Sequence, residues 1–197
     1  MVLPRRRRVY KGSPRTPGAH ASILAPYTET VPIDPSEVRA SDWVTTVDTV
    51  FPNQVNPLGT LFGGVVLQWM DVNAAVACAR FCRQPVVTAS TEPVDFRNPI
   101  YVGEIVEVKS RIAWTGTTSM IVRCEVHGEN PITGERRLCT IGHLNFVAVG
   151  EDGRPTAVPK LRVESALEKR HWETGEHIRQ DILRRRQRKT DTPTGPA

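Results

Sequence analysis

The middle of the chain alternates apolar and polar side chains, which is the pattern of half-buried β-strands. In residues 105–114, for example, Val106 and Val108 alternate with Glu107 and Lys109. Alternation, or a high content of β-branched residues, predicts strands in five segments: 43–50, 86–96, 105–114, 119–127 and 137–149. Short turn sequences separate the last three segments, so we expect these strands to be antiparallel neighbours.

Residues 65–82 have a different pattern, because nearly every side chain in them is apolar. Their length and alanine content favour a helix over a strand, and a helix that is apolar on almost all sides must be surrounded by protein. Residues 52–64 before it are rich in Pro, Asn and Gly and indicate a long loop. The order of strand, loop, buried helix and four strands predicts an α+β domain, in which a curved antiparallel sheet wraps around one long central helix.

Length and charge divide the 197 residues into a folded domain with two extended basic tails. The net charge of +5 is distributed unevenly: +6 in residues 1–28, −5 in 29–159 and +4 in 160–197. We expect three regions, namely a flexible basic N-terminal arm, a folded domain and a charged, partly helical C-terminal tail: 1–40, 41–160 and 161–197.

The chain lacks the sequence signals of membrane, secreted and metal-binding proteins. It has no run of about 18 uninterrupted apolar residues, so we expect no membrane span. No apolar run follows its basic start, so we expect no secretory signal and a cytoplasmic location. We expect no metal, and the cysteines form no C-x-x-C pair and lie in apolar surroundings, which indicates reduced core residues: Cys78, Cys82, Cys124 and Cys139.

Asp71 is the first candidate for chemistry, because it is the only charged residue between Thr60 and Ala79. No basic side chain lies three or four residues from it on the predicted helix, so no local partner offsets the cost of burying its charge. Such a carboxylate is either held by a backbone donor or a distant arginine for structural reasons, or it is used in catalysis.

The loop before the helix contains two weaker candidates. Gly63 and Gly64 either act as a hinge or leave free N–H groups at the start of the helix, where they can polarise a carbonyl oxygen. Asn56 precedes Pro57 and is typical of a turn, although its side-chain amide is also suited to orienting water or a carbonyl group.

Taken together, these segments resemble the signature of the hotdog-fold acyl-CoA hydrolases. The run from Asn56 to Gly64 (Asn-Pro-Leu-Gly-Thr-Leu-Phe-Gly-Gly) and the sequence Trp69-Met70-Asp71 carry most of the resemblance. Shorter matches reinforce it: 86–90, 96–100 with Gly103, 116–119, 146–148, 153–155 and 158–159. The resemblance covers residues 43–160 and leaves both tails outside.

The resemblance implies hydrolysis of an acyl-CoA thioester to CoA and a carboxylic acid, a reaction of fatty acid metabolism that needs no metal and no cofactor beyond the CoA of the substrate. It implies a homodimer whose sheets join edge to edge, with active sites at the interface, and assembly into a trimer of dimers. Asp71 would be the catalytic carboxylate, Asn56 would come from the facing subunit, and Gly63 and Gly64 would receive the thioester carbonyl. Further residues would line the CoA channel: Thr88, Ser90, Gly116, Thr117, Thr118 and Ser119.

Several alternatives remain open at this point. Asp71 could activate water as a general base or attack the thioester to form a mixed anhydride. A hydratase or dehydratase is a second alternative, but it needs a histidine paired with an acidic residue at the site. No histidine lies between His20 and His127, so the loop and the helix cannot supply one. A non-catalytic module that senses acyl-CoA or binds nucleic acid through the basic tails is the remaining alternative, although we expect no nucleic-acid partner.

The chain departs from the family pattern at two positions, Gln54 and Phe81, where many relatives have an acidic residue and a histidine. Both departures concern contacts with CoA rather than the fold. The acidic charge of the central domain also opposes the approach of an anionic substrate. Basic residues near the channel mouth must offset this repulsion, and the candidates are Arg80, Arg97, Arg123 and a basic tail of a neighbouring subunit.

Overall fold

The computed structural model describes residues 33–190, so most of the predicted N-terminal arm lies outside the described part of the chain. Five strands form one antiparallel sheet in the order β2-β4-β5-β6-β3. Their bounds are Val44–Thr49 for β2, Val86–Thr91 for β3, Ile105–Thr115 for β4, Ser119–Glu129 for β5 and Arg136–Ala148 for β6. Two short strands, Val38–Arg39 (β1) and Lys160–Leu161 (β7), pair in parallel beside it.

The central strands are antiparallel neighbours, as the short turns between them predict. Val108 of β4 pairs with Val126 of β5, and Val126 pairs with Thr140 of β6. β3 precedes β4 in the sequence but pairs with β6, where Val86 lies opposite Ala148. β3 and β2 are therefore the two edges of the sheet.

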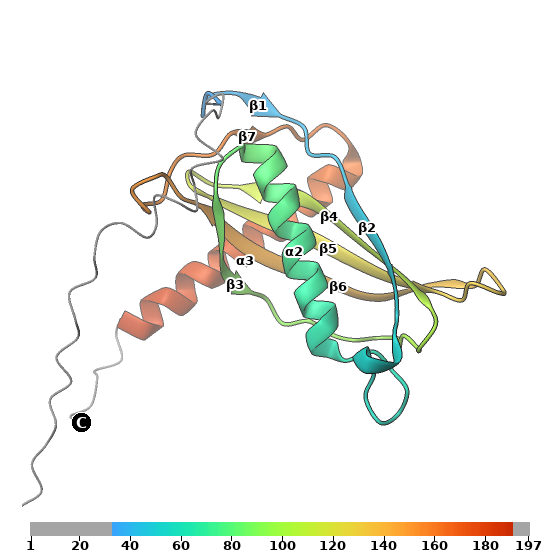
Figure 1. Ribbon diagram of the computed structural model, residues 1–197. Helices are drawn as coiled ribbons and strands as arrows, with labels where there is room; N and C mark the ends of the chain where they lie inside the picture. Colours follow the sequence, from blue (N-terminus) through green and yellow to red (C-terminus); the bar gives the residue numbers. More distant parts are fainter. Residues whose placement is uncertain (1–32, 191–197) are drawn as a thin grey trace, which may run out of the picture. The chain divides into compact units, whose positions relative to one another are not determined.

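The predicted strand 86–96 is too long, because β3 ends at Thr91. Glu92 still donates its backbone N–H to the carbonyl of His143, but Pro93 has no N–H to continue the pairing. The chain then returns without regular structure to β4 and passes the beginning of the long helix α2 (Figure 1).

Helix α2, Gly63–Cys82, lies against one face of the sheet and contacts all five strands (Figure 1). Met70, Ala74 and Cys78 recur every four residues along it, and all three are fully buried against the core. This arrangement of one long helix on a curved antiparallel sheet is the hotdog fold that the sequence predicts. All four cysteines are buried in it.

The expectation that protein surrounds the whole of α2 is not met within one chain. Val72 and Val76 lie on the side of the helix that the sheet does not cover, with exposed fractions of 57% and 37%, and Leu67, on another side of the helix, is 39% exposed. By length and composition alone α2 could cross a membrane. Here it is the core helix of the domain, and part of its apolar surface is exposed within one chain.

Helix α3, Ala166–Thr190, lies on the opposite face of the sheet, over β4 and β5 (Figure 1). The ring centroids of Trp172 on α3 and Trp114 on β4 are 6.0 Å apart. Glu176 accepts a 2.6 Å hydrogen bond from the indole N–H of Trp114. The C-terminal segment therefore forms part of the folded structure, and it covers the outer face of the sheet.

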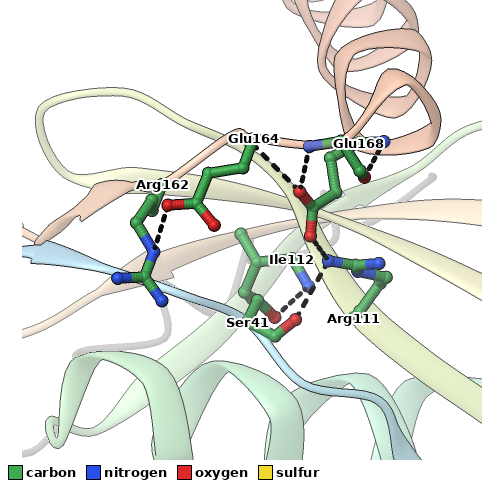
Figure 2. A network of polar contacts seen from close by, with 7 residues as sticks. Ser41, Arg111, Ile112, Arg162, Glu164 and Glu168 are labelled. Carbon is green, nitrogen blue, oxygen red and sulfur yellow. Dashed lines mark hydrogen bonds and ion pairs between the residues drawn. The ribbon is translucent and has the colours of Figure 1, made fainter.

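Figure 2 shows the polar contacts that hold the beginning of α3. Arg111 on β4 donates hydrogen bonds to the Glu168 carboxylate at 2.7 Å and to the Ser41 carbonyl at 3.1 Å. Ser165 and Glu168 form a reciprocal cap, because each side chain accepts the backbone N–H of the other residue. The backbone N–H of Ser165, the guanidinium of Arg111 and the backbone N–H of Glu164 all donate to the Glu168 carboxylate, and they lower its pKa to about 2.

Candidate active site

Asp71 lies in the middle of α2, where the helix passes edge strand β3. The hydroxyl of Thr88 on β3 donates a 2.7 Å hydrogen bond to Oδ1 of Asp71. Asp71 is half-buried, while Thr88 and the neighbouring Val72 are exposed. The carboxylate therefore sits at the border between the core and the uncovered apolar face of α2, accessible to a ligand and held by a neutral donor.

The sequence singles out both Asp71 and Thr88 but does not predict that they touch. The resemblance to the acyl-CoA hydrolases implies that Thr88 lines the CoA channel, and the structure brings the threonine to the carboxylate itself. The register explains this, because Thr88 pairs with Phe146 of β6, whose side chain belongs to the core beneath α2. Thr88 consequently points to the side of the sheet that carries the helix.

Ser90 does not share this orientation. A β-bulge between Thr88 and Ser90 shifts the register, and Ser90 lies opposite Asn145 rather than a core residue. Side chains of directly paired residues point to the same face, so Ser90 faces away from Asp71. Its buried hydroxyl has no hydrogen-bond partner among the described residues.

The thiol of Cys124 lies near Asp71. Cys124 is fully buried, and its Sγ lies 3.8 Å from the backbone carbonyl of Met70. Burial, and to a smaller extent the Asp71 carboxylate, raise the pKa of Cys124 to about 12, although the Ser110 hydroxyl opposes the shift. Cys124 is therefore a protonated thiol at neutral pH and no nucleophile.

Asn56 organises its own loop. Its side-chain oxygen accepts the backbone N–H groups of Leu58 at 2.9 Å and Thr60 at 3.2 Å, and its amide donates to the Thr60 hydroxyl at 2.8 Å. These contacts are the turn chemistry that the sequence allows as an alternative. Within one chain the structure does not bring Asn56 to Asp71. The loop presents Leu58 at its tip, with 84% of the residue exposed.

The first turn of α2 has the free N–H groups that its glycines predict. The backbone N–H groups of Val65 and Val66 both bond to the carbonyl of Phe62, whereas those of Gly63 and Gly64 have no acceptor within residues 33–190. A Cβ at Gly63 would come within 3.2 Å of the Phe96 ring, and nothing lies near Gly64. Gly63 thus permits close packing of Phe96, and Gly64 faces open space.

A pocket of about 340 Å³ opens beside this turn. Gly63 and Val66 form its wall on α2, Ile100 and Cys139 lie at its base, and Phe96 stands beside it. Asp71 does not line this pocket. Seven or eight residues separate Asp71 from the glycines along α2, which corresponds to about 12 Å along the helix axis.

The turn Gly116–Ser119 lies apart from Asp71. It joins β4 to β5, and Thr117 and Thr118 accept the backbone N–H groups of Val158 and Ala148. In the register, Met120 pairs with Phe146 and Phe146 with Thr88, so the turn is about 10 Å, two strand spacings, from Thr88. A Cβ at Gly116 would lie 2.7 Å from the Trp114 ring, which gives this glycine a packing role.

Within the described range, no group of three or more His, Cys, Asp or Glu residues is arranged to hold a metal ion. The polar groups of the site are thus one carboxylate, one hydroxyl and the two N–H groups of a helix N-terminus. A carboxylate and an anion-binding N-terminus are the groups that acyl transfer requires, but in one chain they are too far apart to act on the same bond.

Comparisons with known proteins identify the family of this chain. Residues 58–135 match the thioesterase superfamily profile. The chain is 41% identical over 119 residues to the uncharacterized acyl-CoA thioester hydrolase YkhA of Bacillus subtilis, an alignment that covers 60% of this chain and 69% of that protein.

Solved structures agree as well. A hexameric acyl-CoA thioesterase in its apo form has a TM-score of 0.73 and 36% identity, with 76% of this chain and 97% of that chain covered. An acyl-CoA hydrolase of Staphylococcus aureus, solved with butyryl-CoA and CoA, has a TM-score of 0.71 and 29% identity, with 78% and 95% covered. The chain therefore belongs to the hotdog-fold acyl-CoA thioesterases of the thioesterase superfamily.

Proposed function

We propose that this protein hydrolyses acyl-CoA thioesters in the cytoplasm, in active sites that two copies of the chain build together. The observation that carries the proposal is the position of Asp71. Its carboxylate is held by Thr88 at the border of an uncovered apolar face, and the exposed Val72 and Val76 leave that face open to a second subunit.

The spacing of three polar residues supports the assignment. Variants of the Staphylococcus aureus hydrolase have been solved in which one aspartate, one asparagine or one threonine is replaced by alanine. In that protein the three positions are separated by 15 and 17 residues, and the same intervals separate Asn56 from Asp71 and Asp71 from Thr88. The spacing thus supports a joint role for these three residues here.

The length of α2 supports a site shared between subunits. A thioester carbon needs the carboxylate and the oxyanion donors within a few ångströms of it, whereas Asp71 and Gly63 are about 12 Å apart on one rigid helix. We infer that Asp71 of one subunit meets the helix N-terminus and Asn56 loop of the facing subunit. Two relatives are named as hexameric, which suits a trimer of such dimers.

The chemistry follows from these groups. The free N–H groups of Gly63 and Gly64 would bind the thioester oxygen and stabilise the negative charge that develops on it. Asp71 would remove a proton from the attacking water and pass it to the leaving CoA thiolate. Alternatively, Asp71 would attack the carbonyl carbon itself and expel the CoA thiolate, which takes a proton from water, and a water molecule would then hydrolyse the anhydride to the free acid. The Thr88 hydroxyl would orient the carboxylate. A thioester is already activated, so no metal is required.

The decisive experiment replaces Asp71 by asparagine, which keeps the shape of the side chain and an oxygen that accepts from Thr88. We expect release of free thiol from acyl-CoA to fall by a factor of about 10³ or more, as removal of a catalytic base or nucleophile does. Asp48→Asn on exposed edge strand β2 is the matched control and should retain its rate. A near-normal rate for Asp71→Asn, in protein with unchanged assembly, would refute the role of Asp71.

A further inference from the structure

We propose that the pocket beside the first turn of α2 binds the acyl chain, and that it selects unsubstituted hydrocarbon chains of short or medium length. This inference rests on the proposed function, since it names the acyl group that the same site accepts. The pocket and the N–H groups of the proposed oxyanion site share one residue, Gly63. A carbonyl oxygen bound there places the carbon chain next to the pocket.

The base of the pocket is apolar and closed. Val66, Ile100 and Cys139 line it, and their exposed fractions are 3%, 4% and 2%. All three belong to the main hydrophobic core, so the pocket ends against packed side chains rather than opening on the far side. Its volume of about 340 Å³ lies near the lower end of the range of small-molecule sites, roughly 300–1,000 Å³. Long acyl chains would exceed it.

Apart from the exposed Arg97, the polar side chains of the lining already have hydrogen-bond partners. The Thr140 hydroxyl donates to the carbonyl of Asp95 at 2.8 Å, and the Asn98 amide donates to the carbonyl of Leu138 at 2.8 Å. The Thr60 hydroxyl accepts from Asn56. Among the described residues, no lining side chain has a buried nitrogen or oxygen without a partner.

A satisfied lining determines the chemical class of the ligand. A hydroxyl or keto group at the closed end of the pocket, among Val66, Ile100 and Cys139, would find no free side-chain partner there, and it would lose its hydrogen bonds to water. A hydrocarbon chain loses nothing in the same transfer and gains apolar contacts. Arg97 also lines the pocket but is exposed, so it does not offer a charge at the closed end for a dicarboxylic acyl group.

The test varies the size of one residue at the base in both directions. Val66→Ala should move the preferred acyl-CoA, in a series from acetyl to palmitoyl, towards longer chains, and Val66→Ile should move it towards shorter ones. Val122→Ala removes the same atoms from a fully buried core position that does not line the pocket, and it should leave the preference unchanged. Gel filtration and circular dichroism would show that each variant folds and assembles.

Substituted substrates test the chemical class. We expect kcat/KM for 3-hydroxyhexanoyl-CoA to be lower than for hexanoyl-CoA by about tenfold or more, and glutaryl-CoA to be a poor substrate. An unchanged chain-length preference in both Val66 variants, or a preference for hydroxylated or dicarboxylic chains, would overturn the pocket assignment while leaving the proposed hydrolysis intact.

Failure of the proposed function can be distinguished from failure of the pocket assignment. If the wild-type protein cleaves no acyl-CoA, hydrolysis is refuted, and binding of S-alkyl-CoA thioethers by calorimetry then tests the pocket alone. Affinity that rises with alkyl length and then stops rising at a length that depends on residue 66 supports the pocket. Affinity that is independent of alkyl length refutes it.

Discussion

The guanidinium of Arg111 lies 2.7 Å from the carboxylate of Glu168, and this contact joins the central strand β4 to the C-terminal helix α3. Arg111 is almost completely buried and also lies over the ring of Trp43, 5.4 Å from its centroid. A buried guanidinium without its carboxylate is costly. Glu168 therefore decides whether α3 can remain on the outer face of the sheet.

We expect Glu168→Gln to lower the free energy of unfolding by about 1–3 kcal/mol at neutral pH, because it removes the charge facing Arg111 and weakens the cap with Ser165. Urea unfolding followed by tryptophan fluorescence would measure the change. Glu173→Gln, on the exposed side of the same helix, is the control and should change stability by less than about 0.5 kcal/mol. Equal effects of the two substitutions would contradict a special role for the Arg111 contact.

Acid should destabilise the protein in two successive pH ranges. Burial lowers the pKa of His143 from 6.5 to about 4, with smaller contributions from Arg123 and from His171 on α3. The unfolded chain binds this proton more readily than the folded one, so stability is complete above pH 6.5 and falls as the pH drops towards 4. The pKa of Glu168 is lowered from 4.5 to about 2, so a second loss of stability follows as the pH drops from 4.5 towards 2.

Urea titrations at several pH values would test the first range. We expect a slope of up to about 1.4 kcal/mol per pH unit from His143 between pH 6.5 and 4, and His143→Gln should remove that part of the slope. His171, whose pKa burial also lowers, contributes in the same direction. A variant with an unchanged slope would show that His143 does not titrate as its burial implies.

We expect Gly175→Ala to destabilise the protein, although alanine favours helices by about 1 kcal/mol over glycine. A Cβ at this position would lie 2.4 Å from Cβ of Trp114, an atom that cannot move without the backbone of β4. The net loss should be about 1–3 kcal/mol in urea unfolding. Thr174→Ala, one residue earlier and exposed, should be neutral or stabilising, and a stabilising Gly175→Ala would mean that α3 packs less closely than described.

The Thr88 hydroxyl should affect catalysis more than stability. Thr88→Val keeps the branched shape but removes the donor to Asp71, so we expect kcat/KM to fall by about tenfold or more, the effect of one hydrogen bond to a charged group. Thr88→Ser keeps the donor and should retain activity within a few-fold. Equal losses in both variants would indicate that the methyl group, and not the hydrogen bond, matters.

Mixing two inactive variants should restore activity if each site uses two subunits. Asn56→Asp keeps the oxygen that accepts from Leu58 and Thr60, so the loop should keep its shape while losing the amide. Refolding it together with Asp71→Asn produces mixed dimers in which one site carries both substitutions and the other carries neither. We expect about a quarter of the wild-type rate from equal amounts. No recovery, with mixed dimers demonstrated, would place both residues in one subunit's site.

Much of the domain could be predicted because its patterns are local. The alternation in residues 105–114 predicts a half-buried strand, and the apolar stretch from Val65 to Cys82 predicts a buried helix, without reference to any other part of the chain. Asp71 stood out for the same reason, as one charge in that stretch. The Thr88–Asp71 contact was not predictable, since it depends on how β3 pairs with β6, 58 residues apart for Thr88 and Phe146.

The packing of α3 on the sheet is not predicted from the sequence, although the sequence contains a signal for the start of this helix. Ser165 and Glu168 have the spacing of a capping box, which marks the start of a helix. The buried side of the helix carries His171, Gly175 and Ile182 rather than a row of large apolar residues, so its stripe looks thin in the sequence. Its packing relies on Trp114 and Arg111 of β4, which no local pattern connects to it.

The order of the elements has a consequence for the synthesis of this chain. Helix α2 leaves the ribosome before β3, β4, β5 and β6, the strands that later bury its core side. Until residue 129 has been made, an apolar segment of 20 residues is without the complete β4 and β5, the strands that it contacts most, and such segments aggregate or bind chaperones. Because β6 lies between β5 and β3, the sheet closes only when this strand arrives. Completion of the core is thus a late event in translation, and substitutions in β6 should reduce the yield of folded protein more than equivalent substitutions in β2.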